Sequence, residues 1–310
     1  MEKQQIPKTM LQAIRQFADP QVAHDFFAQI RWPNGIACPR SGCGSAHVAY
    51  LEKHRRWYCN DCKKQFSAKV GTIFEDSPIG LDKWLPAIWL LASNRNGISS
   101  HELARGLKVT QKTAWFMLHR IREAMADKSF EKLRGPVEAD ETWVGGKNKL
   151  TIGPQGWLKP AAPGKGKTSV MGIVERKGKA RAFVVPSIQK KTLHEKIHQH
   201  VEPGAVVYTD AWTGYANLQD HYIHHVINHV KEYVNGHIHT NNIEGFWSVF
   251  KRTLKGTYVR PSPEHLQRYV EEQVYRFNER ENTDGPRFAK ATKGADGKRL
   301  TYKNLIAKNE

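Results

Sequence analysis

Two close pairs of cysteines constrain the fold of this chain more than any other feature of its sequence. The pairs are Cys38-x4-Cys43 and Cys59-x2-Cys62, and they contain all 4 cysteines of the 310 residues. Two such pairs, each on a tight turn, can direct four thiolates at one zinc ion in tetrahedral geometry. Four protein ligands leave no open coordination position, so we expect the zinc to be structural. The pattern predicts a zinc ribbon.

The charge of the chain indicates a polyanionic partner. Lysine and arginine number 48 against 30 aspartate and glutamate residues, which gives a net charge of +18. Cationic side chains gain affinity for nucleic acid by releasing the counterions condensed on its phosphates. Double-stranded DNA is therefore the expected partner. Part of the positive charge lies at the tip of a β-hairpin predicted over residues 47–58, between the cysteine pairs.

A membrane partner is not expected. The longest apolar run is WLPAIWLLA at residues 84–92, whereas a bilayer-spanning helix needs about 20 residues. The first ten residues, MEKQQIPKTM, lack the apolar stretch of a secretory signal. We therefore expect a cytoplasmic, nucleoid-associated protein, in which the reducing environment makes disulfides between the cysteines improbable.

A helix-turn-helix is predicted after the ribbon. Ser99 and Glu102 have the spacing of a capping box, and Thr110 stands where it can cap a second helix over residues 111–127. Apolar residues recur at helical spacing through both segments. The second helix of such a motif makes base contacts with its first residues. The expected DNA-contacting residues are Gln111, Lys112 and Thr113.

From residue 135 the pattern changes from helices to strands. Three consecutive strands, a helix, two further strands and a last helix follow one another, in the order of a ribonuclease H-like α/β core. In such a sheet the first and fourth strands are neighbours. A Gly/Lys/Pro-rich loop, 146–167, separates the first two strands. The predicted strands are 136–145, 169–175, 180–186, 205–210 and 222–228, and the predicted helices are 191–201 and 242–255.

Three acidic residues stand where this core brings them together. Asp140 lies in the first strand, Asp210 ends the fourth, and Glu244 begins the last helix. Magnesium prefers carboxylate oxygens and leaves room for water and phosphate. Two such ions can stabilise the attacking and leaving oxygens of a phosphoryl transfer. We therefore expect the three acids to bind two Mg²⁺ ions, which Mn²⁺ can replace.

The last predicted helix has one polar and one apolar face. Glu244, Ser248, Lys251 and Lys255 recur at helical spacing on the polar face. Lys251 lies two turns beyond Glu244 and points the same way, so we expect it to hold a DNA phosphate beside the metal ions. The apolar face consists of Ile243, Phe246, Phe250 and Leu254.

These motifs, taken in order, resemble a DDE-type insertion-sequence transposase of the ISXO-like branch. After the ribbon and the helix-turn-helix come DETWVGG from Asp140, VYTDAWTGY around Asp210 and HTNNIEGFWSVFKR around Glu244. The resemblance covers nearly the whole chain. It implies binding to the terminal inverted repeats of a mobile element, cleavage at the element ends, and joining of the freed 3′-hydroxyl to target DNA. Magnesium would be required, and no covalent protein intermediate would form.

The resemblance also assigns roles to single residues. Asp140 and Asp210 match the first two metal-binding acids, Glu244 the third, and Lys251 the basic residue seven positions later. Some members of the branch place Asn at the third position, so Asn241 and Asn242 stay open as alternatives. We favour Glu244, because a carboxylate is the stronger magnesium ligand and because Glu244 shares a helix face with Lys251.

Two further acids flank Asp140. Strand alternation sends Glu141 to the opposite face of the sheet, whereas Glu138 shares the face of Asp140 but lies about 7 Å further back. Both are treated as secondary to the three acids.

The complete prediction is an α/β protein whose ribonuclease H-like core follows a zinc ribbon and a helix-turn-helix. Because two element ends must be brought together, we expect a homo-oligomer on DNA. The predicted domains are a zinc ribbon with an N-terminal helix (1–75), a helix-turn-helix segment (76–130), a DDE catalytic domain (131–280) and a basic C-terminal tail (281–310).

Two other functions are compatible with the pattern. The first is a metal-dependent nuclease or resolvase on the same core, which would have no need of two DNA-binding modules. The second is a catalytically inactive DNA-binding regulator, which would have no need of Asp140, Asp210 and Glu244. A strand-transfer assay separates the transposase from the nuclease, and element-end DNA that is bound but never cut in the presence of magnesium would indicate the regulator.

Overall fold

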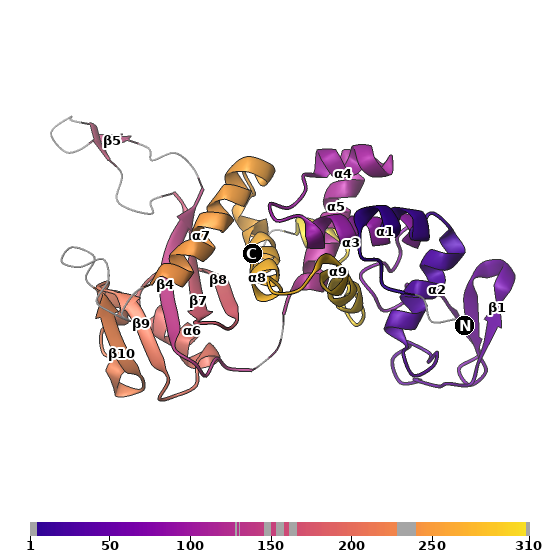
Figure 1. Ribbon diagram of the computed structural model, residues 1–310, viewed down its shortest axis with the longest axis horizontal. Coiled ribbons are helices and arrows are strands. Elements are labelled where there is room, and N and C mark those ends of the chain that lie inside the picture. The colour runs from indigo at the N-terminus through magenta and orange to yellow at the C-terminus, as the bar shows by residue number, and fades with distance from the viewer. Residues whose placement is uncertain are drawn as a thin grey trace. The chain divides into compact units, whose positions relative to one another are not determined.

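The chain folds into two compact units (Figure 1). The structure is a computed structural model that describes residues 5–127, 129, 131–145, 150–152, 158–160, 166–227 and 240–307. Unit 1 combines Met1–Ala126 with Glu279–Glu310, and unit 2 is the intervening segment Asp127–Asn278. None of the helices in the described part of the chain is long and apolar enough to cross a membrane.

Unit 1 contains a small antiparallel sheet and a group of helices. The sheet has the order β1-β2-β3, and the hairpin predicted over residues 47–58 is confirmed as β1 and β2. The elements are α1 (Met10–Phe17), α2 (Pro20–Arg31), β1 (Val48–Leu51), β2 (Arg56–Cys59), β3 (Gln65–Phe66), α3 (Leu81–Ser93), α4 (Ser100–Leu107), α5 (Gln111–Met125), α9 (Asp284–Lys293) and α10 (Tyr302–Ile306).

Stacked rings pack the sheet against α2. Trp57 of β2 is buried and stacks on the ring of Phe66 of β3, with ring centroids 5.7 Å apart. The ring of His24 of α2 stacks on Trp57 at 5.0 Å. These contacts add an apolar core to a sheet whose strands are too short to supply one alone.

The caps predicted for α4 and α5 are confirmed. The Ser99 hydroxyl accepts a hydrogen bond from the Glu102 N–H, and the Glu102 carboxylate accepts one from the Ser99 N–H. The Thr110 hydroxyl accepts from the Thr113 N–H at the start of α5. Between the two helices Lys108 adopts a left-handed conformation with φ of 51°, which ends α4 and turns the chain into α5.

The C-terminal segment differs from the predicted tail. Residues 281–310 contain α9 and α10, and they belong to unit 1. The fully buried Phe288 of α9 contacts the rings of Phe17, Phe26 and Trp89. Phe288 stands between charged residues in the sequence, which conceals its role as a buried anchor, and its packing against α1, α2 and α3 stabilises α9.

Unit 2 is built on a five-stranded mixed sheet with the order β10-β9-β4-β7-β8. β4, β7 and β8 pair antiparallel, whereas β4, β9 and β10 pair parallel. The first and fourth predicted strands, now β4 and β9, are neighbours as expected. The elements are β4 (Val137–Val144), β5 (Leu150–Ile152), β6 (Leu158–Pro160), β7 (Thr168–Glu175), β8 (Ala180–Val185), α6 (Lys190–His200), β9 (Val206–Asp210), β10 (Ile223–Ile227), α7 (Asn241–Thr253) and α8 (Leu266–Asn278).

Helices cover both faces of this sheet (Figure 1). On one face Leu193 and Ile197 of α6 pack against Met171 and Ile173 of β7. On the other face α7 and α8 pack against the alternate residues of β7, such as Val170. All five predicted strands of the sheet and both predicted helices are present, with ends shifted by one or two residues.

One part of unit 2 was not predicted. The Gly/Lys/Pro-rich segment 146–167, expected to be a loop, contains the antiparallel pair β5 and β6. Each strand has only three residues, which is too short for an alternating pattern to stand out from the surrounding glycine, lysine and proline.

Candidate active site and zinc site

The four cysteine sulfurs come together in unit 1. All four lie within 4.8 Å of one another, and among the described residues they are the only such group of three or more metal-binding side chains. The Cys38 and Cys62 sulfurs are 3.8 Å apart, and those of Cys43 and Cys59 are 3.6 Å apart. Zinc–sulfur bonds of about 2.3 Å in a tetrahedron require sulfur–sulfur distances of about 3.8 Å. The donor set therefore fits one structural Zn²⁺.

Backbone hydrogen bonds within the second cysteine pair favour the thiolate form of Cys59, which is the form that binds zinc. Hydrogen bonds from the backbone of Cys62, and then of Asp61, lower the pKa of Cys59 to about 6. Because metals bind the thiolate, a lowered pKa reduces the cost of losing the proton.

In unit 2 the pairing of two parallel strands determines where the two aspartates lie. Val137 pairs with Val207 and Glu138 with Tyr208, so the offset between β4 and β9 is 70 residues. The same offset separates Asp140 from Asp210, so each lies two residues beyond the last β4–β9 pair, next to the point where this pairing ends. The N–H of Trp212 donates to Asp210 Oδ1 at 3.0 Å and so orients this carboxylate.

Glu244 approaches the aspartates from the first turn of α7. Burial, followed by the negative charges of Asp210 and Glu244, raises the pKa of Asp140 to about 6. The Thr240 hydroxyl donates to Glu244 Oε1 at 3.3 Å. The three carboxylates form a looser group than the cysteines, but they are near enough for their charges to interact. A divalent cation among them would offset this repulsion.

A tryptophan on α7 holds Asp140 from above the sheet. Trp247 Nε1 donates to Asp140 Oδ2 at 3.1 Å. Across the β4–β7 pairing, the residue opposite Asp140 is Gly172. A Cβ atom at position 172 would lie 2.6 Å from the ring of Trp247. Glycine is therefore required for the indole to lie on the strand and reach Asp140.

Glu141 points to the opposite face, as alternation predicts. It accepts a hydrogen bond from the hydroxyl of Tyr215, which belongs to the core on the α6 side. Burial, and then the charges of Asp140 and Asp210, raise the pKa of Glu141 to about 8. Because its carboxylate is turned toward Tyr215 on the α6 side of the sheet, Glu141 suits the role of a metal ligand less well than the three other acids.

The other predicted residues of α7 lie in different surroundings. Asn241 and Asn242 are both exposed, but the side-chain amide of Asn242 donates to Glu138 Oε1 at 2.8 Å. Lys251 is exposed two turns beyond Glu244, on the same polar face of the helix. The apolar face predicted for this helix is buried, together with Trp247.

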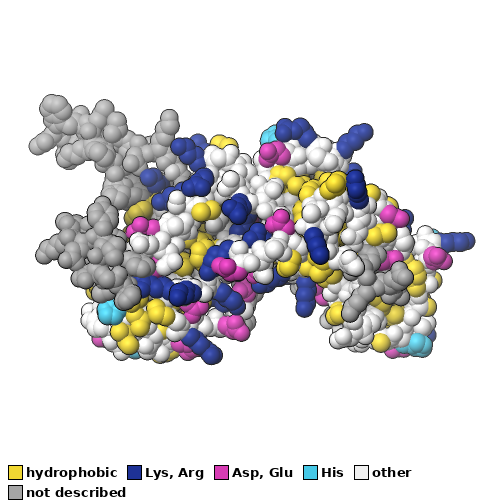
Figure 2. Space-filling model, in the orientation of Figure 1, with side chains coloured by type: hydrophobic (Ala, Val, Ile, Leu, Met, Phe, Trp, Pro, Cys, Tyr) yellow, Lys and Arg dark blue, Asp and Glu magenta, His cyan; other side chains and the backbone are white. Residues whose placement is uncertain are grey.

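The predicted DNA-contacting residues open α5 in unit 1. Gln111 and Lys112 are exposed, and Thr113 is half-buried. The Gln111 side chain donates to the Ser100 hydroxyl at 2.8 Å, and the Lys112 ammonium lies 4.9 Å from the centre of the Tyr302 ring. Lysine and arginine side chains are spread over the visible surface of each unit in Figure 2.

Comparison with known proteins links both sites to one family. Residues 132–278, which contain the three acids, match the family described as "ISXO2-like transposase domain". Residues 19–65, which contain the four cysteines, match "Transposase zinc-ribbon domain". A transposase-like protein of Haemophilus influenzae is 36% identical over 106 residues, which are 34% of this chain and 85% of that protein.

The chain belongs to the ISXO2-like transposase family. A second relative, a protein in transposable element ISH50 of Halobacterium salinarum, is 29% identical over 256 residues. That match covers 78% of this chain and 85% of the relative. The resemblance noted from the motifs is confirmed at the level of the transposase family and its zinc ribbon.

Three residues near the site of this transposase were not singled out from the sequence. They are Gly172, Tyr215 and Trp247, and a fourth, Glu138, was given only a secondary place. A glycine inside a strand pattern signals a close approach by another group, but the sequence does not say which group approaches. Trp247 follows the apolar spacing of α7, so its pattern predicts core packing and not the hydrogen bond to Asp140.

Proposed function

We propose that this chain is a DNA transposase that binds the terminal inverted repeats of an insertion sequence and catalyses metal-dependent strand cleavage and strand transfer. The β4–β9 pairing carries the proposal, because Asp140 and Asp210 share its offset of 70 residues. The electrostatic effect of Glu244 on Asp140 adds the third acid. Family membership supports the reaction class.

We assign a ribonuclease H-like fold to the catalytic core, over residues 131–280. The order β10-β9-β4-β7-β8 supports this assignment, because the three consecutive strands form one antiparallel side and the two later strands add in parallel beside the first. In this arrangement Asp140 lies within β4, Asp210 ends the neighbouring strand β9, and a helix on one face supplies the third acid, Glu244.

The acids Asp140, Asp210 and Glu244 would hold two Mg²⁺ ions, which Mn²⁺ can replace. When bound, such ions stabilise the attacking and leaving oxygens of an in-line phosphoryl transfer. The contribution of the chain is to orient the ligands through the N–H groups of Trp247 and Trp212. Lys251, exposed beside this site, would hold a phosphate of the bound DNA.

Unit 1 would supply recognition of the DNA. We assign a helix-turn-helix to α4 and α5, with Gln111, Lys112 and Thr113 at the start of the recognition helix. The caps of both helices and the short turn between them support this assignment. With two element ends to join, the active species would be a homo-oligomer on double-stranded DNA.

A cleavage and strand-transfer assay tests the proposal. DNA that carries the element's own ends is incubated with Mg²⁺ and with the unaltered protein or with Asp140→Ala, Asp210→Ala or Glu244→Ala. End binding is measured separately with Ca²⁺ in place of Mg²⁺. We expect each variant to bind the ends and to lose both chemical steps, because a two-ion site tolerates no missing carboxylate.

The matched variant for Glu244 is Asn241→Ala, since both side chains are exposed in the first turn of α7. Retained activity in Glu244→Ala together with loss in Asn241→Ala would transfer the third ligand to Asn241. If the unaltered protein binds the ends but never cuts them, the protein is a DNA-binding regulator.

A further inference from the structure

We propose that Glu138 is a positioning residue that fixes the third acid of the site by capping the helix that carries it. The inference rests on the proposed roles of Asp140, Asp210 and Glu244. Glu138 is fully buried, at 0% exposure, and its carboxylate accepts hydrogen bonds from α7 and from Arg176, which directly follows β7. It therefore acts through α7 and not on the DNA.

The first turn of α7 is capped from another element. The first N–H groups of a helix have no intrahelical partner, and an N-cap side chain normally satisfies those of the second or third residue. Here the N-cap residue Thr240 makes no such bond. Instead, Glu138 Oε2 accepts from the N–H groups of Asn242 at 2.9 Å and Ile243 at 3.0 Å. A negative charge at this end also favours the helix dipole.

A second set of contacts holds the Glu138 carboxylate in place. Glu138 Oε1 accepts from Asn242 Nδ2 at 2.8 Å and from Arg176 Nε at 2.8 Å. The guanidinium of Arg176 lies over the ring of Tyr208, 3.9 Å from its centre. The arginine charge balances the buried carboxylate, which would otherwise be costly to desolvate.

These contacts join the three elements that carry the acids. Glu138 and Tyr208 are paired in the β4–β9 register. Each lies two residues before an aspartate, and so on the same strand face as that aspartate. On α7 the capped residue Asn242 comes two residues before Glu244, a rise of about 3 Å. A displacement of the helix start would therefore move Glu244 away from both aspartates.

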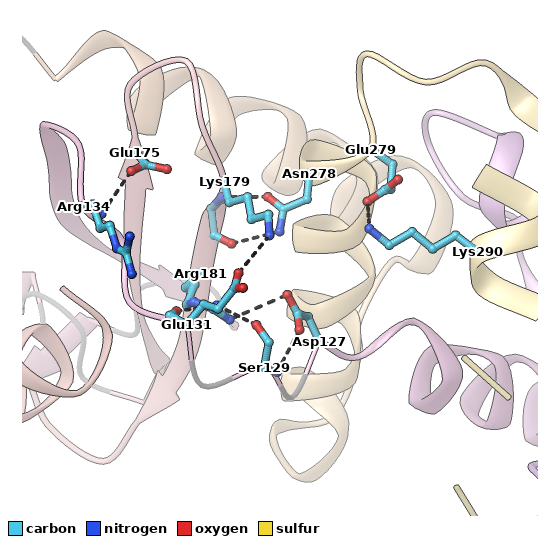
Figure 3. A network of polar contacts seen from close by, with 11 residues as sticks. Asp127, Ser129, Glu131, Arg134, Glu175, Lys179, Arg181, Asn278, Glu279 and Lys290 are labelled. Atoms are coloured by element: carbon cyan, nitrogen blue, oxygen red, sulfur yellow. Dashed lines mark hydrogen bonds and ion pairs between the residues drawn. The ribbon is translucent and has the colours of Figure 1, made fainter. Parts of the chain in front are cut away.

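A second carboxylate in unit 2 provides a matched control. Glu175, the last residue of β7, accepts from the backbone N–H of Arg134 at 3.1 Å (Figure 3) and from that of Gly135 at 2.7 Å. It has the same chemistry as Glu138 and also binds two consecutive N–H groups. Those groups belong to the segment before β4 and not to α7.

The experiment compares Glu138→Gln with Glu175→Gln in the full-length protein, with Glu244→Gln as the reference for a lost ligand. Single-turnover cleavage of element-end DNA is followed as a function of Mg²⁺ concentration, and the melting temperature of each variant is recorded. For Glu138→Gln we expect the cleavage rate at limiting Mg²⁺ to fall roughly 10–100-fold, as for other residues that orient metal ligands. High Mg²⁺ should restore part of the rate, and Glu175→Gln should leave the Mg²⁺ dependence unchanged.

Three results would go against this account in different ways. A normal Mg²⁺ dependence in Glu138→Gln, with Glu244→Gln inactive, overturns the positioning role alone. Equal losses in Glu138→Gln and Glu175→Gln show a general effect on stability and also overturn it. Activity in Glu244→Gln overturns the proposed role of the third acid itself.

Arg176→Gln provides the test if Glu138→Gln does not fold. This change removes the guanidinium that holds Glu138 but leaves the backbone bonds to α7. We expect a smaller change in the same direction, and an unaltered Mg²⁺ dependence in this variant would again overturn the proposal.

Discussion

The zinc ribbon and the acidic site assemble their ligands in opposite ways. The cysteines all lie within the short segment from Cys38 to Cys62, and tight turns bring them together. The acids are spread from Asp140 to Glu244, on two strands and a helix. A local ligand set depends on the turns beside it. A dispersed set depends on strand register and on how the helix is held, so it can be disturbed from far away in the sequence.

The largest expected effect is on the local site. Cys59→Ser removes one of four ligands, and binding of zinc contributes about 10–16 kcal/mol of folding free energy in zinc-finger peptides. We expect the ribbon to lose its zinc and its fold, and element-end binding to be lost, while unfolding of unit 2 stays unchanged. The zinc content per chain measures the loss of the metal, and scanning calorimetry measures the unfolding of the ribbon and of unit 2. A variant that keeps one zinc per chain would contradict the four-cysteine site.

At the acidic site of Asp140, Asp210 and Glu244, we expect Asp140→Asn to raise the free energy of unfolding of the protein in EDTA. The pKa of Asp140 is raised from its ordinary 3.8 to about 6 in the folded chain, so the folded state binds this proton more tightly than the unfolded state. Stability therefore falls as pH rises from about 4 to about 6 and stays lower above that. Asparagine removes the penalty, which amounts to at most about 3 kcal/mol above pH 6.

Urea unfolding between pH 4 and pH 8 checks this expectation, with and without Mg²⁺. Saturating Mg²⁺ should reverse the order of the two proteins, because the cation stabilises the unaltered carboxylate. If Asp140→Asn is less stable than the unaltered protein at pH 8 in EDTA, the negative charge of Asp140 does not lower the free energy of unfolding.

Close packing over the sheet gives the next prediction. Gly172→Ala would place a Cβ 2.6 Å from the Trp247 ring, which costs about 1–3 kcal/mol of stability and displaces the N–H donor from Asp140. We expect lower stability and slower cleavage. The control is Gly245→Ala on α7, where nothing lies within 4 Å of the added Cβ. There alanine should stabilise the helix by about 0.5–1 kcal/mol. Equal stability in both variants would rule out the close contact.

The smallest effect should come from a helix cap made within its own segment. Ser99→Ala removes the side-chain cap of α4, at a cost of about 1 kcal/mol. The Mg²⁺ dependence of cleavage should not change, in contrast to the cap that Glu138 provides for α7. Thermal unfolding measures the loss of stability, and the cleavage assay measures the Mg²⁺ dependence. A shifted Mg²⁺ dependence in Ser99→Ala would contradict the expected difference between the cap of α4 and the cap of α7.

Features with a local pattern were predictable from the sequence. The cysteine pairs, the Ser99–Glu102 capping box and the two faces of α7 each arise from residues a few positions apart, and the structure contains all of them. The neighbouring positions of β4 and β9 followed from the order of the elements and not from any single motif.

Features that depend on distant contacts could not be predicted in this way. Glu138 reads as one more acid in a strand, because its helix partners are more than a hundred residues away. Gly172 shows only that something comes close. Phe288 is the one large apolar side chain of α9, and its contacts with Phe17, Phe26 and Trp89 make it an anchor.

Unit 1 is interrupted by unit 2, and this has a consequence for biosynthesis. The Ile73 N–H bonds to the Ala295 carbonyl, and Phe288 fills a space between helices made much earlier. On the ribosome, the N-terminal helices must therefore wait for some 150 residues of the other unit before their last partner emerges. A chain that ends early would display an unfilled apolar surface on unit 1. Exposed apolar surface of this kind promotes aggregation, so incomplete chains would be withdrawn from solution while complete chains are not.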